Sequence, residues 1–326
     1  MPRGDEWPAL HVPAREIPVP ASVSPQAQAV LARGRIEAAA YPPLAEKEAW
    51  RTMIAIANET LLSLVGDAGA DGVQAEMTEI GGVPAYVITP PGADPADGHV
   101  YLDIHGGALI QGGGDCCRVL GTQTVVRFGV RVWAVDYRMP PDHPYPAPLD
   151  DCVAAYRALL EDHHPAQIIV GGGSAGGNLA AALILRARDE GLPLPAAAVL
   201  MTPEADLTES GDSFRTNEWI DTVGGTSLMP VNLLYANGHD LHHPYLSPLF
   251  GDFAKGFPPT LLSCGTRDLF LSNTVRMHRA LRAAGVPAEL HVMEAAPHGG
   301  FMADTPEERE LTREIRHFIA SHRRGQ

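Results

Sequence analysis

Ser174 is the residue whose sequence context most favours chemistry. It lies in a Gly-x-Ser-x-Gly pattern, directly after the apolar run 167–170 and before a helix-forming stretch, 179–188. A strand that turns sharply into a helix strains the backbone of its corner residue, and this requires neighbours without bulk, here Gly172 and Gly176. Such a turn would expose the Ser174 hydroxyl at the positive end of the helix. In a chain with 33 glycines, the pattern alone is equally consistent with a plain strand-helix turn.

Asp268 and His298 could complete a catalytic set with Ser174. Asp268 follows the apolar run 260–264, and His298 follows a run that ends near Met293. A serine is a poor nucleophile at neutral pH, so it needs a base, and the base needs a carboxylate that fixes its tautomer. The order Ser, Asp, His is that of α/β-hydrolases. Taken separately, the aspartate could be a helix cap and the histidine a loop residue, but their order and context favour a shared role.

A glycine-rich segment could stabilise negative charge near Ser174. The sequence His-Gly-Gly-Ala at 105–108 follows the apolar run 100–104, and glycines let backbone N–H groups approach a developing oxyanion. The N–H of Ala175 would add a further donor. Taken alone, this segment and the glycine run 111–115 are more consistent with flexible turns.

These residues need a scaffold that brings their segments together. Apolar runs predict strands that alternate with helical stretches after a hairpin, which is typical of a mostly parallel sheet covered on both faces. The hairpin is expected at 73–80 and 83–89, the strands at 99–104, 130–135, 167–170, 196–201, 260–264 and 288–293, and the helices at 118–128, 149–161, 179–189, 272–284 and 306–321. The carboxyl ends of parallel strands meet at one edge, which is where each candidate residue falls.

Two regions lie outside this alternation. Helices are predicted to begin at Ser24 and at about Leu44, and the second has an apolar stripe. The interval 202–259 is too long for a plain loop, so we expect helical lid material around 228–235.

Composition narrows the function classes. The 326 residues suit one α/β domain with an added lid, and the net charge of −15 argues against nucleic acid and anionic membranes as partners. No stretch approaches the roughly 20 apolar residues that cross a bilayer, and the N-terminus lacks a signal-peptide pattern, so we expect a cytoplasmic protein. Four cysteines, two of them adjacent, do not form a disulfide framework. The histidines at 239–243 lack a completing ligand set, and neither a metal nor a cofactor is expected.

From about Ala27 to the C-terminus, the chain resembles the bacterial hormone-sensitive-lipase family of esterases (family IV). The segments that carry this resemblance, besides the motifs above, are 137–151, 206–208, 244–249 and 258–262. The resemblance implies the α/β-hydrolase fold: a mostly parallel eight-stranded sheet flanked by helices, with a helical cap. It also implies a division into an N-terminal segment with cap helices (1–66), a first core part (67–203), a cap insertion (204–240) and a second core part (241–326).

The resemblance also implies roles for individual residues. Ser174 would be the nucleophile, His298 the base and Asp268 the acid that orients it. The oxyanion donors would be Gly107, Ala108 and Ala175, with Gly106 shaping the turn.

Four positions depart from the family's pattern. Ala108 stands where a third glycine is usual, Gly173 where an aspartate is common, and two glycines follow His298 where one is more familiar. Glu204 occupies a position that is often aromatic. It is either a helix or loop cap, or a carboxylate that faces the substrate pocket.

The leading interpretation is a serine carboxylic-ester hydrolase that acts on small to medium acyl esters through an acyl-enzyme. A lactone hydrolase would use the same steps, and transferase or dehydratase chemistry on the same residues stays open. The alternative from another class is a non-catalytic small-molecule receptor, like the plant gibberellin receptors, which resemble this family but lack a working histidine. The presence of His298 favours the enzyme. The expected partner is a small-molecule ester or lactone, with no nucleic acid and no membrane, and a homodimer is left open.

Overall fold

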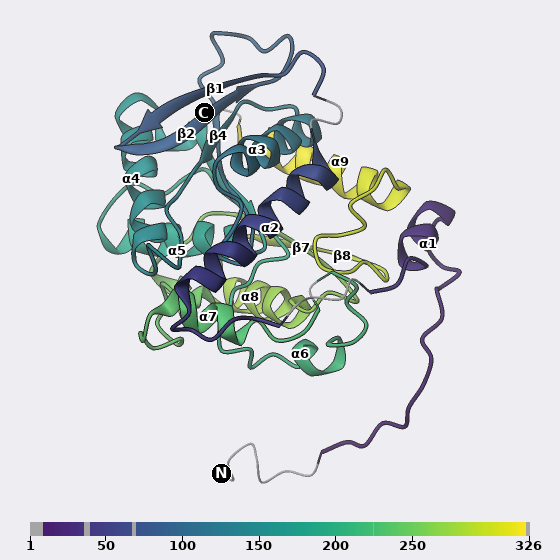
Figure 1. The fold of residues 1–326 in the computed structure, drawn as a ribbon. Helices are drawn as coiled ribbons and strands as arrows, with labels where there is room; N and C mark the ends of the chain where they lie inside the picture. Colours follow the sequence, from purple (N-terminus) through teal and green to yellow (C-terminus); the bar gives the residue numbers. More distant parts are fainter. Residues whose placement is uncertain (1–8, 36–39, 67–69, 224, 324–326) are drawn as a thin grey trace.

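One eight-stranded sheet organises the chain (Figure 1). The structure, a computed structural model, describes residues 9–35, 40–66, 70–223 and 225–323. The strands lie in the order β1-β2-β4-β3-β5-β6-β7-β8, and in this sheet β2 runs in the direction opposite to the other strands. Their bounds are β1 Gln74–Ile80, β2 Val83–Thr89, β3 Val100–Ile104, β4 Val132–Val135, β5 Ile168–Gly173, β6 Ala197–Met201, β7 Thr260–Gly265 and β8 Ala288–Met293. The predicted fold class and every predicted strand are confirmed.

The strand sequences reflect how each strand is covered. In β3 and β7 every residue is buried, because helices lie on both faces, and this explains their continuous apolar runs. The edge strand β1 is exposed except at Ile80 and carries two glutamates and a threonine. Charged side chains on an edge discourage pairing with another chain.

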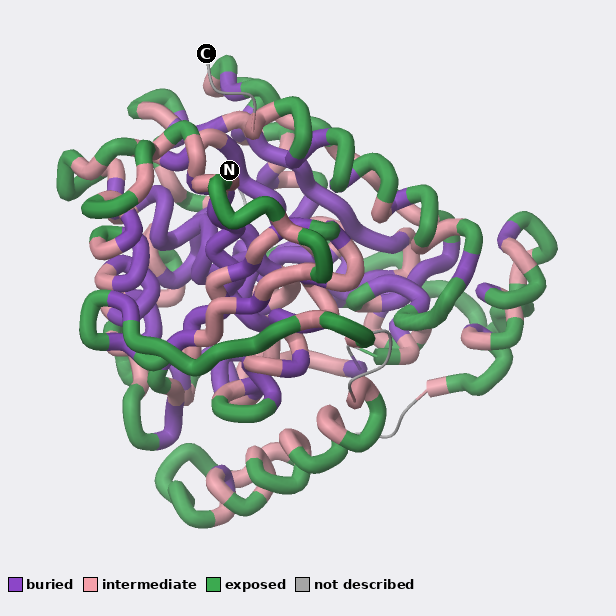
Figure 2. Tube along the Cα trace, turned by 90° about the horizontal axis from the view of Figure 1, so that it is seen from above, coloured by how far each residue is buried: buried purple, intermediate pink, exposed green. Residues whose placement is uncertain are grey.

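Five long helices cover the two faces of the sheet. Helices α3 (Asp115–Phe128) and α9 (Pro306–His322) pack on one face, through side chains such as Val125 and Ile315. Helices α4 (Ala147–Asp162), α5 (Ala175–Asp189) and α8 (Leu271–Ala283) pack on the other face. Seen from above, the buried parts of the chain gather at the centre and the exposed parts surround them (Figure 2).

Helices α3 and α5 begin earlier than the sequence predicted. α5 begins at Ala175 rather than 179, and α3 at Asp115 rather than 118. The first turn of α5 contains Gly176 and Gly177. Glycine has a low helix propensity, so the sequence did not predict this turn, but packing overrides the propensity.

The remaining α-helices pack near loops that follow the strands. They are α1 (Pro25–Leu31), α2 (Lys47–Val65), α6 (Ser213–Thr216) and α7 (Met229–Ala236). Short 3-10 helices occur at 165–167, 248–250 and 253–255, and the first of these directly precedes β5. The predicted helix at 228–235 corresponds to α7, and the helix predicted from about Leu44 begins at Lys47. No helix in the described ranges combines the length and apolar character needed to cross a bilayer.

The N-terminal helices contact loops that follow the strands. Trp50 of α2 packs with Ile110, from the loop after β3, and with Val231 of α7. Helix α1 packs through Ala27 on Ala296, in the loop after β8. The boundaries of the expected cap remain predictions, and the one at 66/67 borders residues 67–69, which lie outside the described residues.

Candidate active site

Ser174 forms the corner between β5 and α5. Its φ of 57° lies in the left-handed region, which a serine adopts only when its surroundings impose it. The cause is the close approach of β3: a Cβ on Gly172 would lie 2.5 Å from the Ile104 carbonyl oxygen, and one on Gly176 only 1.9 Å from the same atom. The two predicted glycines are therefore required here. The Ser174 N–H donates to the Met201 carbonyl at 2.9 Å, which anchors the corner to β6.

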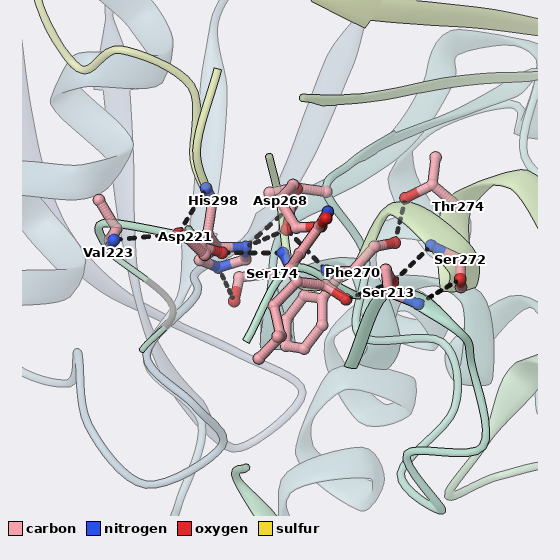
Figure 3. A network of polar contacts seen from close by, with 12 residues as sticks. Ser174, Ser213, Asp221, Val223, Asp268, Phe270, Ser272, Thr274 and His298 are labelled. Carbon is pink, nitrogen blue, oxygen red and sulfur yellow. Dashed lines mark hydrogen bonds and ion pairs between the residues drawn. The ribbon is translucent and has the colours of Figure 1, made fainter. Parts of the chain in front are cut away.

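The structure brings Ser174, His298 and Asp268 into contact (Figure 3). The His298 Nε2 atom lies 2.9 Å from Ser174 Oγ, and its Nδ1 atom lies 3.1 Å from Asp268 Oδ1. Asp268 is fully buried, whereas the His298 side chain is 15% exposed. Each residue follows the carboxyl end of a strand, namely β5, β8 and β7. The acid is therefore shielded from solvent, while the base and the hydroxyl stay within reach of a substrate.

Thr202 joins this group, and sequence analysis missed it. Its hydroxyl oxygen lies 2.9 Å from His298 Nδ1 and also forms a hydrogen bond with Asp268 Oδ2. Thr202 directly follows β6, so the rule that selected Ser174 from the end of its strand could have selected it as well.

Asp221 ties the loops of the acid and the base together, and nothing in the sequence singled it out. The Asp221 Oδ1 atom accepts the N–H of His298 at 3.2 Å, and its Oδ2 atom accepts the N–H of Leu269 at 2.8 Å (Figure 3). Asp221 is fully buried and lies in the irregular segment between α6 and α7. Such a segment has no periodicity, so sequence analysis had no signal that pointed to it.

The charges around His298 favour its protonated form. Burial by itself would lower the pKa of the imidazole, but the charge and hydrogen bond of Asp268 outweigh burial. The charge of Asp221 acts in the same direction. The pKa of His298 is therefore raised above its ordinary value.

The loop after β3 lies against the serine corner. A Cβ on Gly106 would lie 3.4 Å from the Ser174 Cβ and 2.9 Å from the Gly173 carbonyl oxygen. Gly107 and Ala108 have positive φ values of 127° and 51°. Within the described chain, the N–H groups of Gly107, Ala108 and Ala175 make no hydrogen bond to protein. These donors are therefore free to bind an oxygen atom.

Glu204 has an unusual environment for a carboxyl group. The residue is 1% exposed, and neither carboxyl oxygen has a hydrogen-bond partner among the residues described. The side chain of Asn232 lies beside it and favours its ionised form, and the Asn232 amide nitrogen also donates to the Leu207 carbonyl. Burial, reinforced by the charge of Glu209, raises the pKa of Glu204 to about 8. Its carboxyl therefore caps no backbone N–H group in the described structure.

One group of described residues has donor atoms close enough together to hold a metal ion. His105, Cys117 and Asp136 each offer one atom, and these atoms all lie within 4.8 Å of one another. The His105 Nδ1 atom lies 2.8 Å from the Gly106 carbonyl, so it carries the proton and leaves Nε2 as the acceptor. The histidines at 239–243 are not part of any such group in the described structure.

A cavity of about 400 Å³ lies away from Ser174. It is lined by Asp71, Val73, parts of 90–97 and 125–131, and Arg323. None of the predicted site residues contributes to it, and its lining contains no nucleophile paired with a base.

Comparison with known proteins finds relatives that share this fold. Residues 101–302 match a family model described as alpha/beta hydrolase fold. An acetyl-hydrolase of Streptomyces hygroscopicus is 38% identical over 193 residues, which cover 59% of this chain and 64% of that protein. The crystal structure of esterase E25 is 34% identical with a TM-score of 0.88, covering 97% of this chain and 99% of that one. An esterase from the bacterial hormone-sensitive lipase family is 34% identical with a TM-score of 0.79, covering 92% and 99%.

Proposed function

Because the chain belongs to the bacterial hormone-sensitive-lipase family of α/β-hydrolases and is a carboxylic ester hydrolase, we propose that Ser174, His298 and Asp268 perform the hydrolysis. Ser174 Oγ attacks the ester carbonyl while His298 Nε2 takes its proton. The imidazolium then gives this proton to the leaving alcohol, and an acyl-enzyme remains. Water, activated by the same histidine, releases the acid and restores the serine.

The observation that carries this proposal is the pair of contacts from His298, 2.9 Å to the serine oxygen and 3.1 Å to the carboxylate. A receptor that only binds its ligand has no need of a serine with an oriented base, so these contacts favour the enzyme over the receptor. The test is turnover of nitrophenyl esters by the wild type and by Ser174→Ala. Saturable binding of esters by the wild type without turnover would support the receptor instead.

Backbone N–H groups supply the electrostatic part of the mechanism. Gly107, Ala108 and Ala175 would donate to the oxyanion of the tetrahedral intermediate, with Gly106 allowing the loop to lie against Ser174. Their freedom from other hydrogen bonds within the described residues supports this role. Ala108 keeps the N–H donor of the usual glycine and adds a methyl group, which packs near Trp50.

The substrate we propose is an ester with a small to medium acyl group. The name of the Streptomyces relative, an acetyl-hydrolase, supports short acyl groups. Helix α2 and the insertion 204–240 would form the cap over the acyl site, because Trp50 and Val231 pack together against Ile110 beside the oxyanion loop. A lactone would follow the same steps, except that its leaving alcohol stays tethered to the acyl group. A turnover screen of aliphatic esters and lactones of matched length distinguishes the two.

Glu204 would form a polar part of the wall of this site. Its N–H donates to the Ser174 carbonyl at 3.2 Å, and its carboxylate, when ionised, raises the pKa of both His298 and Tyr41, which precedes α2. Its backbone therefore contacts the serine corner. With its pKa at about 8, the side chain is mainly neutral at pH 7 and becomes a buried anion in more alkaline solution.

A further inference from the structure

We propose that Thr202 is a positioning residue, whose hydroxyl holds the acid and the base of the site in one fixed arrangement. This inference rests on the roles proposed for Asp268 and His298. The Thr202 Oγ atom lies 2.9 Å from His298 Nδ1 and forms a second hydrogen bond with Asp268 Oδ2. His298 and Asp268 also contact each other directly, with 3.1 Å between Nδ1 and Oδ1, so each of the three side chains contacts the other two.

The chemistry of the three groups sets the direction of each hydrogen bond. An ionised carboxylate only accepts, so the Thr202 hydroxyl must donate its single proton to Asp268. The Thr202 oxygen can then only accept at the contact with His298, so Nδ1 must carry a proton and donate to it. His298 Nε2 is consequently the unprotonated nitrogen and faces the Ser174 hydroxyl at 2.9 Å. The threonine therefore selects the same tautomer as the aspartate.

The backbone of Thr202 is held in a conformation that its side chain disfavours. Its φ is 44°, in the left-handed region, where a β-branched residue is rarely found. Its N–H donates to the Ser263 carbonyl at 2.6 Å, and Pro203 follows it. Strain of this kind persists where the surrounding structure imposes it, and here it directs the hydroxyl at the two catalytic side chains.

Thr202 and Phe270 restrict the imidazole in different ways. The Phe270 ring packs edge-on against the His298 ring, with 4.7 Å between the ring centres, so it limits tilting without fixing the tautomer. Thr202 provides a second acceptor for the N–H that becomes most acidic when His298 takes the serine proton. A hydrogen bond to a charged group stabilises more than one between neutral groups, so the effect is largest in the transition state.

The test compares Thr202→Val, Thr202→Ser and the control Thr274→Val in the full chain. Valine keeps the shape and the β-branch, and so the strain, but removes the hydroxyl. Serine keeps the hydroxyl. Thr274 is buried like Thr202, but its hydroxyl donates to the Phe270 carbonyl and reaches neither catalytic side chain. We expect Thr202→Val to lower kcat about 10- to 100-fold, as for loss of a hydrogen bond to a charged group, with KM changed less than about twofold.

Two further comparisons distinguish a positioning role of Thr202 from a purely stabilising one. Thr202→Ser should restore kcat to within about threefold of the wild type, and Thr274→Val should keep its kcat even where its Tm falls. Adding Thr202→Val to Asp268→Asn should cost less than it costs alone, because both act through one imidazole. Wild-type kcat in Thr202→Val, or equal losses in the valine and serine variants, would overturn the inference. If Ser174→Ala remained active, the proposed function itself would fail.

Discussion

The His298 Nε2 atom lies 2.9 Å from Ser174 Oγ, although 124 positions separate the two residues in the chain. Their strands, β8 and β5, are separated by β6 and β7 in the sheet. At the usual spacing between strands, the histidine loop must therefore reach back across about 14 Å of sheet edge. Helix α1 supports this loop from one side through Ala296, and Asp221 holds it through the His298 N–H. The base is thus in place only when segments from distant parts of the chain have packed.

Ser174→Ala should abolish ester turnover and labelling by an organophosphonate, because no other group supplies the attacking oxygen. Turnover of a nitrophenyl ester and mass spectrometry of the labelled protein measure this. Ser63→Ala, on the exposed side of α2, is the matched control and should label normally. Labelling of the Ser174→Ala protein at another serine would contradict the assignment.

Asp268→Asn should lower kcat on the order of 10⁴-fold, because an amide nitrogen facing His298 Nδ1 favours the wrong tautomer. Steady-state kinetics on one ester are sufficient for this measurement. Asp304→Asn, at an exposed position in the loop that follows His298, changes the same chemical group away from the site and should keep its activity. A loss below about tenfold would indicate that another carboxylate orients the base.

The acid limb of kcat/KM should lie above pH 6.5, the ordinary pKa of histidine. His298 acts as a base only when neutral, and its raised pKa keeps it protonated to higher pH. Removing the opposite charge should therefore move the limb toward lower pH in Asp268→Asn. A pH series of kcat/KM for both proteins tests this expectation, and a profile that stays flat down to pH 4 would exclude His298 as the base.

Glu204→Gln should become increasingly stable relative to the wild type as the pH rises. The carboxyl has an ordinary pKa of 4.5 and a pKa of about 8 in the folded chain, so the folded state holds the proton more tightly. Its contribution is fully present below pH 4.5 and is lost progressively up to about pH 8, whereas glutamine does not titrate. The difference in unfolding free energy should grow by an amount on the order of a few kcal/mol across this window.

Thermal unfolding at intervals between pH 4 and 9 measures this difference. Glu76→Gln on the exposed edge strand β1 is the control and should show no such trend. A Tm difference between Glu204→Gln and the wild type that is the same at every pH would mean that the carboxyl does not titrate in this range.

The same Glu204→Gln variant also tests the proposed substrate wall. Below pH 8 the wild-type carboxyl is mainly neutral, so both proteins should treat a carboxylate-bearing ester alike relative to its neutral analogue. Above pH 8 the wild type should discriminate against the anionic ester, because repulsion is strong where water is excluded. The measurement is the ratio of kcat/KM for the two esters, at pH 7 and at pH 9, in both proteins. If the wild type has the same ratio at pH 9 as at pH 7, Glu204 does not line the substrate site.

The sequence predicted the fold because each strand of a buried parallel sheet is a continuous apolar run. The runs ending at Ile104, Met201 and Met293 each correspond to a strand. It also predicted that Ser174, Asp268 and His298 meet, because each follows such a run and parallel strands end at one edge. Helix starts were less predictable where glycines serve close packing, as at Gly176, because propensity then opposes the structure that forms.

The parts of the site that could not be predicted depend on tertiary contacts. Asp221 acts through backbone N–H groups of residues about 48 and 77 positions away, and no local pattern records such contacts. The environment of Glu204 includes Asn232 and Tyr41, which precede or follow it by many positions in the chain, so no local pattern records it. The role of Thr202 could not be predicted because it depends on how the backbone at the end of β6 directs the hydroxyl toward His298.

The double attachment made by Asp221 limits how freely substrate preference can be redesigned. Its carboxylate lies in the segment 204–240, which we propose as part of the cap, yet it accepts hydrogen bonds from the main chain beside both the acid and the base. The segment proposed to select the substrate is therefore not an exchangeable module. A chimera that carries the insertion of a relative would bind the new ester. It would still hydrolyse this ester slowly unless the graft also carried an acid at this position.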